Sequence, residues 1–191
     1  MYAPGHQIES PSPWVCRWAG LIRRGGRVLD VACGSGRHLR HLGSLGFSVV
    51  GVDRDEAALD LSRGIAGVEV RVADIEAGPW PFAPGEFDGV VVTNYLWRPV
   101  FANLLGALRP GGVLIYETFA LGNERYGRPA NPDHLLQRDE MLRRVEPLCV
   151  VAFEQGFVSV PKAAVIQRIC AVLGDRGPAP LDTPARAIGL E

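Results

Sequence analysis

Two hydrophobic periods alternate along this chain, and together they predict its secondary structure. Apolar residues at helical spacing predict a first helix over residues 14–24, which Gly25 and Gly26 end. After it, short apolar runs typical of buried strands alternate with stretches typical of helices. The pattern predicts strands over residues 27–32, 47–53, 68–72, 87–93, 113–119, 148–157 and 163–173, and helices over residues 37–45, 56–62, 99–108 and 139–145.

This alternation indicates an α/β fold, with a doubly wound, mostly parallel seven-stranded sheet and helices on both faces. Residues 87–93 are almost continuously apolar, as expected of a strand buried on both sides. We expect Pro110, Gly111 and Gly112 to form a sharp turn before the fifth strand. The 191 residues suffice for one domain, which we place at 1–174, with an N-terminal arm over 1–12 and a loose tail over 175–191.

The charge of the chain narrows the class of partner. Its 20 basic and 21 acidic residues give a net charge of −1, whereas a nucleic-acid binder usually has a basic face. The four cysteines form no C-x-x-C pair, which argues against a zinc knuckle and a redox dithiol. We see neither a signal peptide nor an apolar stretch that could cross a bilayer. We therefore expect a cytoplasmic protein that acts on a small molecule, with no nucleic acid or membrane as partner; the oligomeric state stays open.

The most informative stretch is the turn that follows the first predicted strand. There Asp30 stands ahead of Gly34 and Gly36, and a helix begins directly afterwards. Glycines let the backbone turn tightly and let a ligand approach it, and the helix N-terminus favours an anionic group such as a carboxylate. A dinucleotide fingerprint would need a third glycine at the position of Leu39. The acid ahead of the turn would repel a pyrophosphate but attract an ammonium group.

The stretch D-V-A-C-G-S-G over residues 30–36 resembles the first motif of class I S-adenosylmethionine-dependent methyltransferases. The resemblance extends over residues 27–119 and implies the Rossmann-like methyltransferase fold, with S-adenosylmethionine as cofactor. In that family the acid and glycines of this motif contact the methionine end of the cofactor, the acid that ends the second strand accepts from the ribose hydroxyls, and residues after the third strand meet the adenine. The resemblance thus implies a cofactor site of Asp30, Ala32, Gly34, Gly36, Asp53, Arg54, Asp74, Ile75 and Asn94.

Simpler structural roles compete with these assignments. The helix over residues 56–62 needs an N-cap, and Asp55 fits that role better than Asp53. An aspartate after a strand, such as Asp74, is more often a cap or turn residue when taken alone. Cys33 is more readily explained as a small packing residue than as a nucleophile. His38 and His41 share one helix without a further metal ligand at a suitable spacing, so we expect no metal site.

Substrate candidates follow the fourth and fifth strands, because ligands of doubly wound sheets bind at the carboxyl ends of the strands. The alternative is that the aromatic residues belong to the core and the loop arginines to the solvent. Residues 94–99 and 116–132 also resemble a group of small bacterial methyltransferases that includes the tellurite-resistance type. We expect residues 122–131 to form a flap over the pocket, with arginines that favour an anionic acceptor. The substrate candidates are Tyr95, Trp97, Arg98, Tyr116, Arg125, Tyr126 and Arg128.

The sequence therefore predicts an enzyme that transfers a methyl group from S-adenosylmethionine to a small-molecule acceptor, anionic if the loop arginines contact it. No histidine paired with a carboxylate stands out beyond the fourth strand, so we assign no catalytic base. Two alternatives stay open: an NAD-dependent oxidoreductase on a related sheet, and a methyltransferase-like module that binds without turnover. The identity of the acceptor atom also stays open.

Overall fold

A computed structural model of the chain describes residues 10–175 and residue 181. The rest of the expected arm and tail lies outside the described residues. The strands are β1 (Arg27–Val31), β2 (Ser48–Asp53), β3 (Val68–Val72), β4 (Phe87–Thr93), β5 (Leu108–Phe119), β6 (Cys149–Val158) and β7 (Ala164–Val172). The helices are α1 (Pro13–Trp18), α2 (Arg37–Ser44), α3 (Glu56–Asp60), α4 (Phe101–Ala107) and α5 (Glu140–Arg144), with 3₁₀ turns η1 (Ala19–Leu21), η2 (Arg98–Val100), η3 (Asn123–Arg125) and η4 (Pro132–His134).

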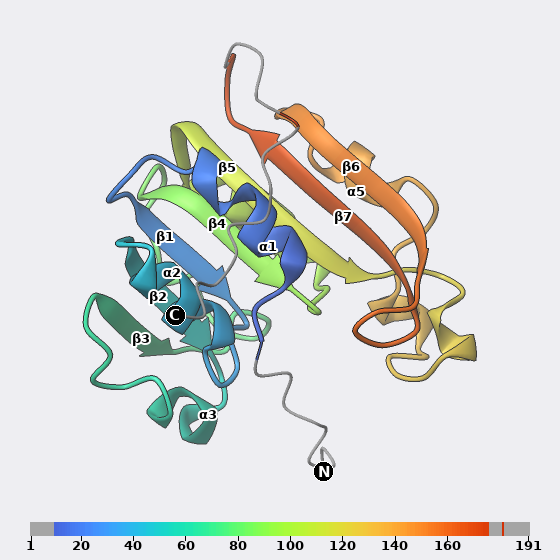
Figure 1. The fold of residues 1–191 in the computed structure, drawn as a ribbon, viewed down its shortest axis with the longest axis horizontal. Coiled ribbons are helices and arrows are strands. Elements are labelled where there is room, and N and C mark those ends of the chain that lie inside the picture. The colour runs from blue at the N-terminus through green and yellow to red at the C-terminus, as the bar shows by residue number, and fades with distance from the viewer. Residues whose placement is uncertain (1–9, 176–180, 182–191) are drawn as a thin grey trace, which may run out of the picture.

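One seven-stranded sheet in the order β3-β2-β1-β4-β5-β7-β6 organises the domain (Figure 1). The first five strands are parallel, and β7 runs antiparallel to both β5 and β6. This confirms the predicted doubly wound, mostly parallel sheet. The parallel strands all end at one side of the sheet, which we call the carboxyl edge. Since Phe119 at the end of β5 pairs with Ile166 near the start of β7, the β6–β7 turn lies at that edge too.

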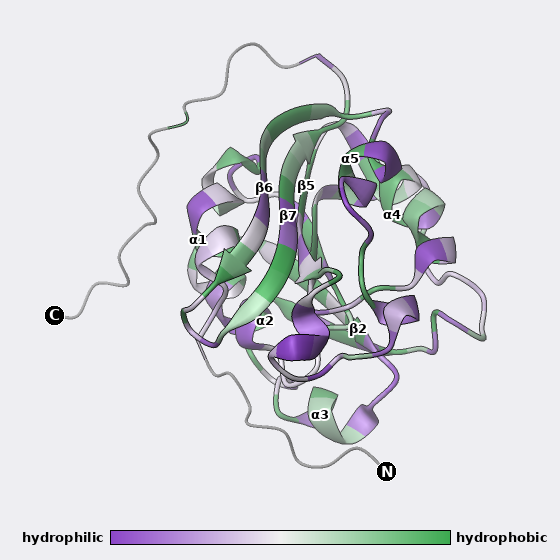
Figure 2. Cartoon of the chain, turned by 90° about the vertical axis from the view of Figure 1, so that its right-hand side faces the viewer, coloured by the Kyte–Doolittle hydropathy of each residue, from purple (hydrophilic) through white to green (hydrophobic). Residues whose placement is uncertain are grey.

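Helices cover both faces of the sheet, and each face has its own apolar core (Figure 2). Successive side chains of a strand point to opposite faces, so β4 contributes Val90 and Val92 to one core and Val91 to the other. The first core includes residues of α4 and α5, and the second includes residues of α1, α2 and α3. Six of the seven residues of β4 are buried, which confirms the prediction from its apolar run.

The structure corrects several predicted boundaries. The first helix ends at Trp18 and continues only as the 3₁₀ turn η1, where Gly20 lowers helix propensity. β5 begins earlier than predicted, because Leu108 already pairs with Phe87, and residues 110–112 form an irregularity within that strand rather than a turn before it. Ser12, predicted as part of the N-terminal arm, is buried, and its hydroxyl accepts a hydrogen bond from the backbone N–H of Trp14 as the N-cap of α1.

Candidate active site

The glycine turn between β1 and α2 forms one wall of the site. Ala32, Gly34 and Gly36 all have positive φ angles, of 52°, 53° and 80°. A left-handed conformation is costly for alanine, and such strain is common where a backbone is shaped for a ligand. A Cβ placed on Gly34 would meet no atom within 4 Å, so open space adjoins the turn there. At Gly36 the neighbour is the protein itself, because a Cβ would overlap the Ser62 hydroxyl.

Asp30 lies under this turn and is 1% exposed. Its Oδ2 has no hydrogen-bond partner among residues 10–175, and the nearest basic group is Nδ1 of His38, 3.9 Å away. Burial raises the pKa of Asp30 to about 8; the positive charge of Arg37 opposes that shift and Asp53 adds to it. A buried carboxylate without a partner is costly, so this position favours a ligand that brings positive charge.

His38 is held neutral beside Asp30. Its Nε2 accepts a hydrogen bond of 3.0 Å from the backbone N–H of Ser12, so the ring proton is on Nδ1, the nitrogen that faces Asp30. Burial lowers the pKa of His38 to about 3, and the positive charge of Arg37 adds to that effect. His38 therefore fixes the N-terminal segment at the carboxyl edge and does not neutralise Asp30.

Asp53, at the end of β2, reaches the same turn. Its Oδ2 accepts from the backbone N–H of Gly34 at 2.8 Å, and its Oδ1 accepts from that of Asp55 at 3.0 Å. Asp55 in turn caps α3 by accepting from Ala58 N, which confirms Asp55 as the N-cap expected from the sequence. The link from Asp53 to Gly34 was not predicted, since nothing in a sequence tells which backbone donor a carboxylate selects.

The remaining cofactor candidates lie on loops of the same edge. Asp74 is exposed, and its Oδ1 accepts from Glu76 N and Ala77 N, so the structure gives it the turn role that the sequence left open. Ile75 packs against the core beneath it, and Arg54 Nη1 lies 4.0 Å from Glu76 Oε2.

The strand-four edge adds Asn94 and Tyr95. Asn94 has a φ of 55°, and its N–H donates to the carbonyl of Glu117, which joins the ends of β4 and β5. Burial, with the negative charge of Glu76 next, raises the pKa of the Tyr95 phenol. The loop around Glu76 and the strand-four edge are therefore neighbours.

The aromatic substrate candidates are mostly core residues. Tyr116 is fully buried, stacks on Phe101 with ring centroids 5.3 Å apart, and donates its hydroxyl proton to the carbonyl of Tyr95 at 2.8 Å. Trp97 is partly buried against the same core. Tyr116 thus supports the backbone that carries Tyr95 and presents no surface of its own to a substrate.

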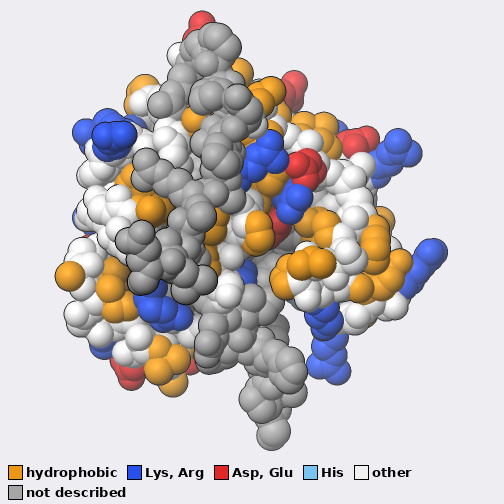
Figure 3. Space-filling view, viewed as in Figure 1, with side chains coloured by type: hydrophobic (Ala, Val, Ile, Leu, Met, Phe, Trp, Pro, Cys, Tyr) orange, Lys and Arg blue, Asp and Glu red, His pale blue; other side chains and the backbone are white. Residues whose placement is uncertain are grey.

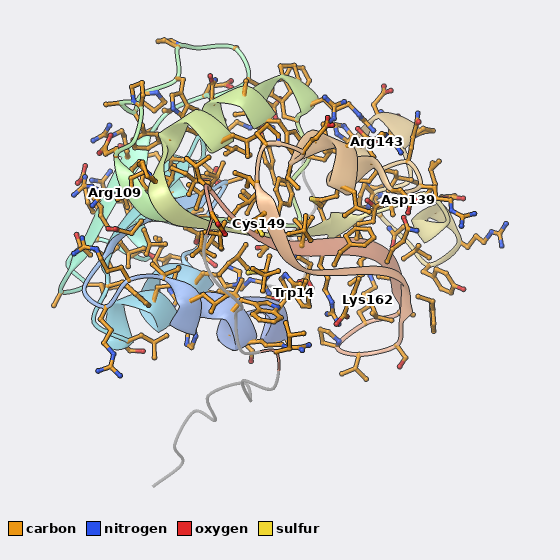
Figure 4. The ribbon with its side chains drawn as sticks, turned by 90° about the horizontal axis from the view of Figure 1, so that it is seen from above. Trp14, Arg109, Asp139, Arg143, Cys149 and Lys162 are labelled. Atoms are coloured by element: carbon orange, nitrogen blue, oxygen red, sulfur yellow. The ribbon has the colours of Figure 1, made fainter. Side chains whose placement is uncertain are left out.

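Arg98 is bound by the protein itself. Its Nε and Nη2 donate to the two carboxylate oxygens of Glu140 at 2.8 and 3.0 Å, while Nη1 and Nη2 donate to the carbonyls of Asp133 and Leu135. Burial disfavours the charge of Glu140, but hydrogen bonds from Arg98 and other donors outweigh it and lower its pKa to about 2. A hollow of about 380 Å³ beside this pair is lined by Arg98, Gln137, Glu140, Arg143 and Arg144. Figure 4 shows the position of Arg143 on α5.

The segment expected to be a flap is folded against the β6–β7 hairpin. Asn123 is buried; its Nδ2 donates to the carbonyl of Pro129, and its Oδ1 accepts from Val165 N. Tyr126 contacts Phe157 of β6, with ring centroids 5.0 Å apart. Arg125 and Arg128 are exposed. The segment therefore has a defined structure at the carboxyl edge, with its cations directed to solvent.

A polar cluster at the carboxyl edge escaped the sequence analysis. Arg37 donates to the hydroxyl of Thr93 at 3.3 Å, and Ser12 donates its hydroxyl proton to Glu117 at 2.8 Å. Ser12 and Glu117 are 105 positions apart, so no local pattern could have paired them. The local signal for this cluster is the position of Arg37 directly after the glycine turn.

Comparisons with known proteins fit this geometry. A family described as a methyltransferase domain matches residues 28–112. The tRNA U34 carboxymethyltransferase of Methylococcus capsulatus is 35% identical over 127 residues, which cover 57% of this chain and 36% of that protein. The ubiquinone biosynthesis O-methyltransferase of Thiobacillus denitrificans is 30% identical over 136 residues, or 65% of this chain and 57% of that protein. The chain thus spans about a third to over half of the length of these curated relatives.

Among solved structures, TehB from Haemophilus influenzae matches 86% of this chain and 63% of its own with a TM-score of 0.72 at 16% identity. That similarity establishes the fold. Residues 28–112 thus match a methyltransferase-domain family, and the sheet has the Rossmann-like fold of that class, in agreement with the resemblance that the sequence implied. Two further structures with this fold, at 17% identity, are described as S-adenosylmethionine-dependent methyltransferases from Methanosarcina mazei and Mesorhizobium loti. No helix within the described part of the chain is both long and apolar enough to cross a bilayer.

Proposed function

We propose that this chain binds S-adenosylmethionine at the carboxyl ends of β1 and β2 and transfers its methyl group to a small-molecule acceptor. The observation that carries the proposal is the buried carboxylate of Asp30, whose Oδ2 lacks a partner within residues 10–175. An ammonium group would give that oxygen a charged donor and offset the cost of its burial. S-adenosylmethionine carries an ammonium and a sulfonium, whereas the pyrophosphate of NAD would be repelled.

The residues around the turn fit such a cofactor. Open space at Gly34 gives the methionine end access to the backbone, and Asp53 stands beside it at the end of β2 for the ribose. Arg54, Asp74, Ile75 and Asn94 continue along the same edge toward the adenine. When bound, the cofactor supplies a methyl group that is already activated by its sulfonium.

The protein's part in the reaction is then to align an acceptor and to exclude water. Of the other groups described at the turn, Cys33 and His38 are poorly suited to remove a proton, and we assign the carboxylates of Asp30 and Asp53 to the cofactor. Burial raises the pKa of the Cys33 thiol, and His38 is neutral with its Nε2 bound to the N–H of Ser12. We therefore favour an acceptor that needs no base, such as a soft anion. Arg125 and Arg128 would attract it to the carboxyl edge, since Arg98 is already paired with Glu140.

The relatives do not agree on an acceptor, since one is named for tRNA and another for ubiquinone biosynthesis. The near-neutral charge of this chain favours a small molecule over tRNA. A module that binds the cofactor without turnover is the competing proposal.

Incubation with radiolabelled S-adenosylmethionine and a metabolite extract separates these proposals. We expect label to appear in a small, acidic fraction that anion exchange retains. Tight cofactor binding without label in any small-molecule fraction would support the silent module instead.

A further inference from the structure

Exposed apolar and cationic side chains gather at the far end of the carboxyl edge, on the lobe formed by residues 121–130 and the β6–β7 hairpin (Figure 3). We call this surface the tip patch. Its apolar members are Leu121, Tyr126, Phe157 and Val160, which are 49%, 42%, 55% and 78% exposed, and its cations are Arg125, Arg128 and Lys162.

Contacts between the two segments make the tip patch one surface. The ring centroids of Tyr126 and Phe157 are 5.0 Å apart. The carbonyl of Val165 accepts a hydrogen bond from the N–H of Ala120, and its own N–H donates to Oδ1 of Asn123. Lys162 Nζ lies 3.5 Å from where a Cβ on Gly127 would stand. The apolar and cationic groups of both segments are therefore presented together.

The charge of the patch is positive and uncompensated. Within residues 10–175, none of its three cations forms a salt bridge, although most other arginines at the surface do. The one carboxylate of the segment, Glu124, accepts a hydrogen bond from Gly122 N. Three cations thus stand beside one carboxylate, and an anionic partner would meet cations that form no ion pair among the described residues.

The shape of the patch points to the kind of partner. Residues 159–162, which form the β6–β7 turn, are all exposed, and Val160 is the most exposed large apolar side chain of the described chain. A protruding apolar turn flanked by cations suits the surface of a lipid bilayer, which has no fixed shape. There the apolar side chain can enter the headgroup region while the cations contact anionic headgroups. A protein partner would instead need a groove matched to this turn.

We propose that the tip patch docks this protein on the surface of an anionic lipid bilayer. The expectation of no membrane partner came from the lack of a spanning stretch, but surface docking needs none. Docking would place the carboxyl edge next to the bilayer, because the β6–β7 turn lies at that edge. The proposed function bears only on the consequence of docking, which is that the methyl-transfer site would face the bilayer. The docking itself does not depend on the proposed function.

Flotation with vesicles tests the proposal without cofactor or acceptor. Phosphatidylcholine vesicles are compared with vesicles that also contain phosphatidylglycerol, at about 0.1 M and about 1 M salt, where the Debye length falls from about 10 to about 3 Å. We expect the protein to float with the mixed vesicles at low salt and to be released at high salt. Equal binding to both kinds of vesicle, or binding to neither, would overturn the proposal.

Matched variants locate the contact. Lys162→Gln should lower the partition coefficient about fivefold, the effect of one cation near an anionic surface, and Val160→Asp should lower it at least as much. The controls are Val150→Asp, at the opposite end of β6, and Arg24→Gln, in the turn before β1. Both positions are exposed and lie away from the patch, so both variants should bind as the wild type does. Figure 4 shows Lys162 and Cys149, the neighbour of Val150, at the two ends of the hairpin. A loss in the controls equal to that in the patch variants would also overturn the proposal, and thermal melting checks that all four are folded.

Discussion

The two halves of the carboxyl edge are built in different ways. On the β1–β2 side, short carboxylates on strand ends contact a turn that follows directly in the sequence, as Asp53 does with Gly34. On the β4–β5 side, long side chains bind distant parts of the chain, as Arg98 does with Glu140. The first half is therefore specified by a local motif, and the second by tertiary contacts that can vary while the fold is kept. This difference explains why a cofactor can be inferred more readily than an acceptor.

The largest effect should come from breaking the turn itself. Gly36→Val places a β-branched side chain at a φ of 80° and onto the Ser62 hydroxyl, which should cost about 4 kcal/mol from backbone strain and overpacking together. Gly34→Ala is the control, because its Cβ meets open space and only the strain of about 1 kcal/mol remains. Urea unfolding measures both. Equal stability of the two variants would mean that Ser62 does not pack against the turn as described.

Asp53→Ala should weaken S-adenosylmethionine binding by about 3 kcal/mol, because a charged acceptor is lost and the N–H of Gly34 loses its partner. Asp55→Ala is the matched control: it removes the N-cap of α3, should cost about 1 kcal/mol of stability, and should leave affinity unchanged. Calorimetric titration of each variant gives the affinities. If the two variants bind equally well, the acid at the end of β2 has no part in the cofactor site.

Asp30 should make the stability of the free protein depend on pH. Its folded pKa of about 8 lies above its unfolded value, so the folded state binds the extra proton and stability falls as pH rises from about 5 toward 8. Asp30→Asn should reduce the slope of the unfolding free energy against pH, by an amount that corresponds to at most about one bound proton. Saturation with S-adenosylhomocysteine, whose ammonium favours the ionised acid, should also flatten the slope. Identical profiles of stability against pH for the variant and the wild type would mean that Asp30 does not contribute to this pH dependence.

The smallest effect on stability is expected on the acceptor side. Replacing both Arg125 and Arg128 by alanine should change stability by less than about 0.5 kcal/mol, since both are exposed. Cofactor affinity should be unchanged, while turnover of an anionic acceptor should fall about tenfold with the loss of charge-assisted hydrogen bonds. Initial rates with the labelled cofactor provide the measurement. Turnover equal to that of the wild type would mean that these arginines do not contact the acceptor.

The fold was predictable because its signals are local and repeated. The apolar run of β4 and the alternation around it predicted strands and helices whose positions the structure confirms. Helix lengths were overestimated, since apolar spacing continues past the point where Trp18 and Asp60 end the α-helical hydrogen bonds. Asp30 and Asp53 could be placed from the strand ends. The roles of Tyr116 and Arg98 could not, because burial and the pairing with Glu140 depend on residues far along the chain.

The most direct test of the central claim is a calorimetric titration of the wild-type protein with S-adenosylmethionine, S-adenosylhomocysteine and NAD in parallel. The unpartnered carboxylate of Asp30 and the acid-led turn predict saturable binding, near one ligand per chain, for the first two and no measurable heat of binding for NAD. Saturable binding of NAD without binding of either sulfur-containing ligand would contradict the account.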